Sequence, residues 1–239
     1  MRGANMPGMA ELLTRVNDVL ARERAVVEDQ LRRNGVTVLH GAATFVDPHT
    51  VAVVAPTGRR TLTAANVLIA VGTRPASPPG IETDGTSVLT SDDIPRLERL
   101  PRSLAVVGGG VIGVEYASMF AALGVQVTLV ERRARVLEFV DDEIVDELVH
   151  QMRNGKVTFR MGEAVDRLER TDGPSPRVVL LLESGKRIVA DAVLFSAGRI
   201  GATEGLGLAA AGLAADGRGR LAVGDDFRTA GRTSSRRVT

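Results

Sequence analysis

The pattern of apolar and polar positions divides the chain into a helical start, a run of short strands and a region where strands and helices alternate. Between Glu11 and Arg33, apolar residues recur mostly every three or four positions, which predicts an amphipathic helix that ends at Asn34-Gly35. Beyond it the period shortens, and the pattern predicts strands over 36–39, 44–46, 51–54, 60–63 and 66–70. Prolines between Pro75 and Gly80 then indicate a crossover between domains.

Residues 81–200 alternate between apolar runs and helical periodicity. Ser91 to Asp93 suits a helix cap, and strands are predicted over 103–107 and 125–130 with a helix over 114–123 between them. Asp141 opens a second helix that ends at Asn154-Gly155, because acids are favoured in a first helical turn. Further strands are predicted over 156–161, 164–170, 177–182 and 188–195, with turns at 172–174 and 184–185. This order predicts one α/β unit with a parallel sheet and an antiparallel excursion.

Three glycines follow the first of these central strands at the G-x-G-x-x-G spacing. Gly108 allows a tight turn, Gly110 lets a pyrophosphate approach the backbone, and Gly113 lets helix and strand pack closely. Val111 and Ile112 lie between Gly110 and Gly113, just before the predicted helix, and unpaired amides at a helix start favour a phosphate. With the flanking strands the motif predicts a dinucleotide site, and a purely structural glycine turn is the alternative.

Composition narrows the function classes. The net charge is +1 and aromatic residues make up 3% of the chain, so neither a nucleic acid nor a membrane surface is an expected partner. Cysteine is absent, which excludes disulfides, thiolate metal sites and a redox dithiol within these 239 residues. The three histidines are widely spaced, and no metal site is expected. The sequence shows neither an apolar membrane span nor a signal region, which predicts a cytoplasmic protein.

From residue 200 onward the pattern changes. Ala and Gly dominate as far as Gly219, a strand is predicted over 221–223, and residues 229–239 are polar and basic without periodicity. Such a segment is typical of a disordered end.

The order of these motifs resembles the flavoproteins with two dinucleotide-binding domains, the class of glutathione reductase and dihydrolipoyl dehydrogenase. Within that class it is most similar to the soluble, Si-specific pyridine nucleotide transhydrogenases. The resemblance is carried by Gly41–Phe45, Ile69–Pro75, Gly108–Ser118, Val136–Asp142 and Ser196–Arg199. It implies a Rossmann-like NAD(P)-binding domain over 81–200, inserted in an incomplete FAD-binding domain over 1–80 and 201–239. The chain is expected to be a central fragment that lacks the family's first FAD motif and its C-terminal dimerisation domain, through which full-length members form homodimers.

The resemblance also implies an activity and further site residues. The activity is transfer of hydride between NADPH and NAD⁺ through bound FAD, with no catalytic residue assigned in this chain, which is itself expected to be inactive. Glu115 matches the position that faces the nicotinamide and the flavin. Gly41, Ala42, Gly72, Thr73 and Gly198 match flavin-side turns. A dihydrolipoyl dehydrogenase-like flavoprotein and a non-catalytic NAD(P)-binding remnant are the alternatives.

The end of the second central strand bears on nucleotide preference. Glu131 can accept a hydrogen bond from a ribose 2′-hydroxyl, which favours NAD. Arg132 stands where NADP-using relatives carry an arginine, and a guanidinium can pair with a 2′-phosphate. Both residues together suit a site that takes NAD and NADP, whereas an NAD-specific site with arginines facing solvent is the alternative.

Overall fold

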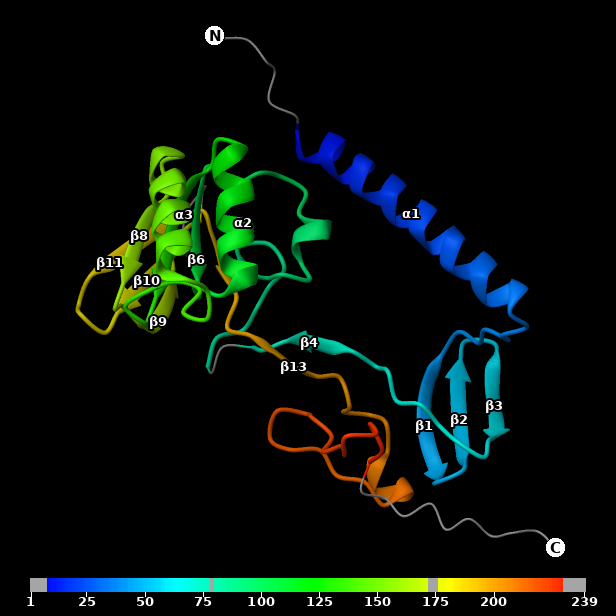
Figure 1. The fold of residues 1–239 in the computed structure, drawn as a ribbon. Coiled ribbons are helices and arrows are strands. Elements are labelled where there is room, and N and C mark those ends of the chain that lie inside the picture. Colours follow the sequence, from blue (N-terminus) through cyan, green and yellow to red (C-terminus); the bar gives the residue numbers. More distant parts are fainter. Residues whose placement is uncertain (1–7, 78–79, 172–175, 230–239) are drawn as a thin grey trace, which may run out of the picture. The chain divides into compact units, whose positions relative to one another are not determined.

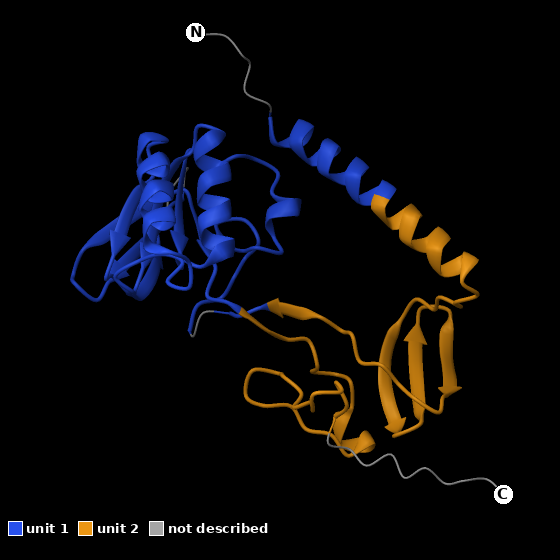
Figure 2. Cartoon of the chain, in the orientation of Figure 1, with its two compact units in different colours: residues 1–22, 75–198 blue, residues 23–74, 199–239 orange. Residues whose placement is uncertain are grey.

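The computed structural model describes residues 8–77, 80–171 and 176–229. The chain forms two compact units, of which unit 1 comprises residues 1–22 and 75–198 and unit 2 comprises residues 23–74 and 199–239 (Figure 2). The assignment of these stretches to a nucleotide domain and a flavin domain stays a prediction. Within the described ranges, none of the helices combines the length and the apolar character needed to cross a membrane.

Unit 1 is built on the predicted parallel sheet, which has five strands. Its order is β5-β12-β6-β7-β8, and neighbouring strands pair in parallel throughout. The strands are β5 (Val88–Thr90), β6 (Ser103–Val107), β7 (Gln126–Glu131), β8 (Thr158–Met161) and β12 (Ala192–Phe195). Helix α2 (Val111–Ala122) connects β6 to β7, and α3 (Asp142–Asn154) connects β7 to β8 (Figure 1). Both helices were predicted from the apolar periodicity.

Both faces of this sheet are covered, which explains why its strands read as continuous apolar runs. Leu104 and Val106 of β6 pack into one core cluster with residues of α2 and α3. Ala105, which points the other way because side chains alternate along a strand, packs into a second cluster with residues of β10. The strands of the covering antiparallel sheet, in the order β11-β10-β9, are β9 (Val165–Arg170), β10 (Val178–Leu182) and β11 (Arg187–Ala190).

The single strand predicted over 188–195 is wrong, because the chain changes sheets at Asp191. β11 pairs antiparallel with β10, whereas β12 pairs in parallel with β6. The Asp191 carboxylate accepts hydrogen bonds from the backbone amides of Arg102 at 2.9 Å and Ser103 at 3.2 Å. A carboxylate bonded to the start of β6 therefore fixes the corner between the two sheets.

The region before β6 also differs from the prediction. β5 is fully buried and was not predicted at all. The cap expected at 91–93 is followed by only a short 3-10 helix, η1 (Ile94–Arg96), and the Asp93 side chain makes no capping bond to it. That carboxylate instead accepts from the amide and the hydroxyl of Thr90, both at 2.7 Å.

Unit 2 contains the predicted antiparallel layer. β1 (Ala42–Asp47), β2 (Thr50–Ala55) and β3 (Gly58–Thr63) form a three-stranded sheet in that order. β4 (Thr73–Pro75) pairs with β13 (Arg199–Gly201), and a short helix, η2 (Leu208–Ala211), follows. The predicted first helix is confirmed as α1 (Met9–Arg33), which is divided between the two units at residue 22 (Figure 2).

Three predicted strands are not formed. Residues 36–39 and 66–70 lie outside every strand that the structure describes, and Leu68 is 89% exposed. An apolar run becomes a strand only where another strand pairs with it, and none of the described segments does so here. Residues 221–223 contribute only the isolated bridges Ala215–Leu221 and Val223–Thr229. The turn expected at 172–174 and nearly all of the basic end lie outside the described residues.

Candidate nucleotide-binding site

The glycine turn begins at the carboxyl end of β6. Gly108 has a φ of 112°, in the region that favours glycine, and its amide donates to the Val130 carbonyl at 2.8 Å. A Cβ atom at Gly108 would lie 2.6 Å from the backbone oxygen of Ser196, which follows β12. The Ser196 hydroxyl in turn donates to the carbonyls of Val107 at 2.9 Å and Gly108 at 3.0 Å. Ser196 therefore supports the turn from the neighbouring strand.

Gly113 is constrained by packing inside the protein. A Cβ atom there would lie 1.9 Å from the Gly108 carbonyl oxygen and 2.5 Å from the Ser196 hydroxyl oxygen. Both distances are far below van der Waals contact, so helix α2 can approach the end of β6 only with glycine at this position.

Gly110 is different, because nothing in the protein crowds it. No heavy atom lies within 4 Å of the position that its Cβ would occupy. Gly110 is the N-cap residue of α2, and no side chain bonds to the helix start there. Val111, the first helical residue, is 48% exposed, and Ile112 is half-buried. The start of α2 therefore presents its backbone amides toward open space, which is the arrangement that binds a phosphate group.

The buried carboxylate of Glu131 joins the end of β7 to the glycine turn. It accepts a hydrogen bond from the Gly109 amide, and Glu131 is only 5% exposed. A Cβ atom at Gly109 would lie 2.9 Å from that carboxylate and 2.6 Å from the Val136 side chain. Gly109 is thus a constrained position of the turn that the sequence motif did not single out.

Glu131 is also bound by Arg133, a contact that sequence reasoning missed. The Arg133 amide donates to Oε1 at 2.8 Å, and its guanidinium donates to Oε1 at 2.9 Å and to Oε2 at 3.0 Å. Burial alone raises the pKa of Glu131, but the hydrogen bonds from Arg133 and Gly109 outweigh it and leave that pKa below its usual value. Glu131 is therefore a charged, fully bonded carboxylate at neutral pH.

The segment after β7 passes beside the glycine turn. The Leu137 amide donates to the Gly109 carbonyl at 3.0 Å, and Leu137 has a φ of 48°, which is uncommon for a residue with a side chain. Arg132 is exposed and has no hydrogen-bond or ion-pair partner among the residues that the structure describes. The exposed guanidinium of Arg132 and the buried carboxylate of Glu131 thus occupy adjacent positions at the end of β7.

The remaining predicted residues lie in other places. Glu115 is exposed on α2, beside the half-buried Tyr116, whose hydroxyl lies 3.5 Å from the Ser91 carbonyl oxygen. Gly198 has a φ of 94°, and its carbonyl accepts from the Ala76 amide at 2.9 Å. Both residues belong to unit 1, as the glycine turn does.

The predicted flavin-side residues of unit 2 form two separate pairs. Gly41 and Ala42 lie at the start of β1, where a Cβ atom at Gly41 would be 2.6 Å from the Val54 carbonyl oxygen. Gly72 and Thr73 lie against the β13 segment. There the Gly72 carbonyl accepts from the Ala202 amide at 3.1 Å, and the Arg199 guanidinium donates to the Thr73 hydroxyl at 2.7 Å. No hydrogen bond joins the two pairs in the described part of the chain.

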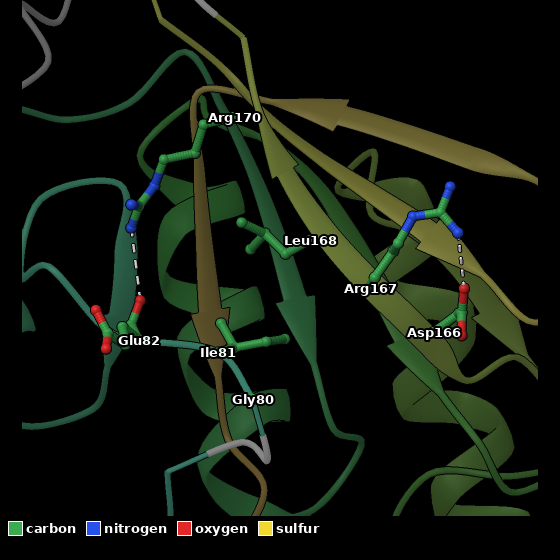
Figure 3. A pocket seen from close by; sticks show the side chains of 7 residues that line it. All are labelled: Gly80, Ile81, Glu82, Asp166, Arg167, Leu168 and Arg170. Carbon is green, nitrogen blue, oxygen red and sulfur yellow. Dashed lines mark hydrogen bonds and ion pairs between the residues drawn. The ribbon is translucent and has the colours of Figure 1, made fainter.

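A shallow depression of unit 1 lies apart from the glycine turn (Figure 3). Its lining contains none of the predicted site residues and consists of Gly80, Ile81, Glu82, Asp166, Arg167, Leu168 and Arg170. Arg167 pairs with Asp166 at 3.2 Å, and Arg170 pairs with Asp84 at 3.0 Å. Because both arginines of the lining already have acidic partners and none of the predicted site residues lies there, we place the candidate site at the glycine turn instead. A second depression, in unit 2, is lined by residues around β13 and η2.

The fold and the glycine turn are typical of dinucleotide-binding proteins, and comparison with known proteins gives an oxidoreductase class. The family model for pyridine nucleotide-disulphide oxidoreductases matches residues 3–234. The chain belongs to this family.

Several curated relatives are named soluble pyridine nucleotide transhydrogenase. One from Mycobacterium bovis is 49% identical over 222 residues, which is 92% of this chain and 47% of the relative. One from Azotobacter vinelandii is 41% identical over 221 residues, with the same shares covered. The chain thus spans about half the length of the curated relatives that it matches.

Solved structures of two other proteins resemble about the same share of this chain in fold. LpdA from Mycobacterium tuberculosis superimposes with a TM-score of 0.85 at 27% identity, covering 96% of this chain and 51% of LpdA. A flavoprotein disulfide reductase from Escherichia coli, RclA, gives a TM-score of 0.82 at 31% identity and covers 91% of this chain and 49% of RclA.

Proposed function

We propose that this chain carries the pyridine-nucleotide site of a soluble transhydrogenase that moves hydride between NADPH and NAD⁺. One structural observation supports the nucleotide site above all others: Gly110 opens onto free space at the uncapped start of α2. Gly108, Gly109 and Gly113 are crowded by the protein itself, so packing accounts for them. No internal contact accounts for Gly110. The close approach of a pyrophosphate does.

The transhydrogenase reaction rests on the relatives of that name. In such an enzyme, bound FAD would take up hydride from one nucleotide and release it to the other. The described residues of unit 2 contain no strand, glycine turn and helix in succession that could hold a flavin pyrophosphate. We therefore assign this chain the nucleotide-binding step and derive no step through the flavin.

Each residue at the proposed site has a distinct part. The amides of Val111 and Ile112 at the start of α2 would donate to the pyrophosphate, whose charge the positive end of the helix stabilises. Glu131, at the end of β7, would lie beside the adenosine ribose, and the exposed Arg132 would meet a 2′-phosphate. Glu115 would face the nicotinamide end of the ligand.

Titration of the purified chain with NADH tests the site. A Gly110→Val variant should still fold, because a Cβ atom there meets no protein atom, and should lose NADH binding, because the added side chain occupies the space of the pyrophosphate. Gly217→Val is the matched control, since Gly217 also has no atom within 4 Å of its Cβ position but lies in unit 2. Equal NADH affinity of the Gly110 variant and the parent chain would contradict the proposed site.

Acceptance of both nucleotides has its own test. Arg132→Ala should weaken NADPH binding by about tenfold, the effect of one charge-assisted contact, and weaken NADH binding far less. Isothermal titration with each nucleotide measures both affinities. Equal losses for the two nucleotides would favour a site specific for NAD.

A further inference from the structure

Glu131 has no acceptor capacity left for a ligand in this structure. An ionised carboxylate offers about four lone-pair positions. Oε1 accepts from the Arg133 amide and from its Nε atom, and Oε2 accepts from the Gly109 amide and a terminal guanidinium nitrogen of Arg133. A ribose 2′-hydroxyl can therefore donate to Glu131 only if one of these four donors leaves.

The Arg133 guanidinium is the donor that can leave. The two amides belong to the backbone of the glycine turn and of the segment after β7, so neither can withdraw without a main-chain shift. The Arg133 side chain is 43% exposed on a flexible stem, whereas the Glu131 side chain is 6% exposed. If this guanidinium is displaced, a ribose hydroxyl can take its place as a hydrogen-bond donor to the buried Glu131 carboxylate.

A second carboxylate is in place to receive the displaced arginine. Glu138 Oε2 lies 3.5 Å from a terminal nitrogen of Arg133, and the Glu138 side chain is 49% exposed. Arg133 thus bridges a buried acid and an exposed one, and after leaving Glu131 it keeps a partner of opposite charge. This lowers the free energy that displacement requires.

We propose that Arg133 determines the nucleotide preference of the site by occupying the place of the ribose 2′-hydroxyl on Glu131. This inference rests on the proposed nucleotide binding at the glycine turn. NADH must displace the guanidinium before its ribose reaches Glu131, which costs affinity. NADPH needs no displacement, because its 2′-phosphate is an acceptor that pairs with the guanidinium where it stands. Arg133 therefore weakens NADH binding and strengthens NADPH binding.

The test compares two neighbouring arginines in the whole 239-residue chain. NADH and NADPH are titrated into the parent chain and into two variants, Arg133→Gln and Arg132→Gln. Each of the two substitutions removes one positive charge. Arg133→Gln should tighten NADH binding and weaken NADPH binding, each by about tenfold, because it removes a competitor for one ligand and a partner for the other. Arg132→Gln should weaken NADPH without tightening NADH. Arg187→Gln, at an exposed position on β11, controls for net charge.

The outcomes separate this inference from the function on which it rests. Tighter NADH binding by Arg133→Gln alone supports it, and NADH affinity that stays equal or falls in that variant overturns it. A parent chain that binds neither nucleotide overturns the proposed function instead. If Arg133→Gln does not fold, Arg133→Lys gives the same comparison, since lysine keeps the charge but cannot reach both carboxylate oxygens with two parallel bonds. If Arg133→Lys binds NADH more tightly than the parent chain does, the inference is supported. Unchanged NADH binding by this variant overturns it.

Discussion

At the scale of single residues, the glycine turn contains two kinds of glycine. Gly108, Gly109 and Gly113 are required by the protein, because a side chain at each would meet backbone or buried atoms within 3 Å. Gly110 is not required by any contact inside the protein. The sequence motif predicts this division for Gly108, Gly110 and Gly113, and the packing around Gly109 adds a further glycine that folding requires.

This difference predicts opposite effects of one added methyl group. Gly113→Ala should destabilise unit 1 by more than about 3 kcal/mol, the upper range for overpacking, because its Cβ would meet the Gly108 carbonyl. Gly110→Ala should lower the free energy of unfolding by no more than about 1 kcal/mol, the cost of alanine at an N-cap position, because its Cβ meets no protein atom. Urea unfolding followed by circular dichroism measures both. Similar stabilities of the two variants would show that the helix can shift to admit the methyl group.

At the scale of elements, the entry into β5 is organised by one carboxylate. Asp84 Oδ1 accepts from the amides of Thr86, Ser87 and Val88 at 2.7–2.8 Å. Its other oxygen accepts from the Ser87 hydroxyl and from Arg170 of β9. Burial raises the pKa of Asp84, but these hydrogen bonds are stronger in sum and hold that pKa well below its usual range.

The lowered pKa of Asp84 gives a stability that depends on pH in a defined direction. Its contribution is fully present above the pKa of the unfolded chain, about 4, and is lost as the pH falls through the lower folded pKa. Asp84→Asn should therefore reduce stability by about 1–3 kcal/mol at neutral pH and reduce the loss of stability below about pH 4. Denaturant unfolding across pH measures this, with Asp166→Asn, an exposed acid, as control. If stability falls with pH below about 4 as steeply in Asp84→Asn as in the parent chain, Asp84 does not cause this dependence.

Helix α3 begins at a side-chain cap. Asp141 accepts from the Glu143 amide at 3.0 Å and precedes two acids in the first turn. Asp141→Ala should lower the stability of the protein by about 1 kcal/mol, and Asp141→Asn should keep most of it because asparagine also caps. Thermal unfolding distinguishes the two variants. An equal loss in both would mean that the charge, and not the capping bond, stabilises the helix.

Elements with local signals could be predicted from the sequence, and elements that depend on a distant partner could not. The glycine turn, α2, α3 and the hairpin of β2 and β3 carry their signals within a few residues of one another. No local signal marks the division between β11 and β12 at Asp191, because its cause is the pair of amides at 102 and 103, which are far away in sequence. The clamp of Arg133 on Glu131 was missed for a related reason. On a continued strand the two side chains would share a face, but no local signal indicates that the chain after β7 turns both the amide and the guanidinium of Arg133 onto the carboxylate.

At the scale of the whole molecule, the buried apolar core belongs mainly to unit 1. Both core clusters consist of residues from unit 1. In the described part of unit 2 the buried apolar residues are Phe45, Ala52 and Ala211, and all six residues of β3 are exposed. Because burial of apolar surface is the main stabilising contribution, the two units are expected to differ in stability.

Amide hydrogen exchange on the whole chain checks this expectation. The amides of β6, β7 and β12 should exchange at least about a hundredfold more slowly than those of β1 and β3, because local opening is easiest where little apolar surface is buried. Within the smaller sheet, the central strand β2 should be the best protected. Uniform protection across the two units would show that unit 2 draws stability from contacts outside its own core.

The position of the one tyrosine allows the difference in stability between the two units to be followed by fluorescence. The chain has no tryptophan, and Tyr116 lies half-buried on α2 of unit 1, with its ring centroid 6.4 Å from that of Phe120. Intrinsic emission of the chain therefore reports on unit 1 alone, whereas far-ultraviolet dichroism sums over both units. A melting step that appears in the dichroism without a counterpart in the emission belongs to unit 2. A reduced nicotinamide absorbs and emits at longer wavelengths than tyrosine, so one cuvette can follow both an added nucleotide and the unit that is proposed to bind it.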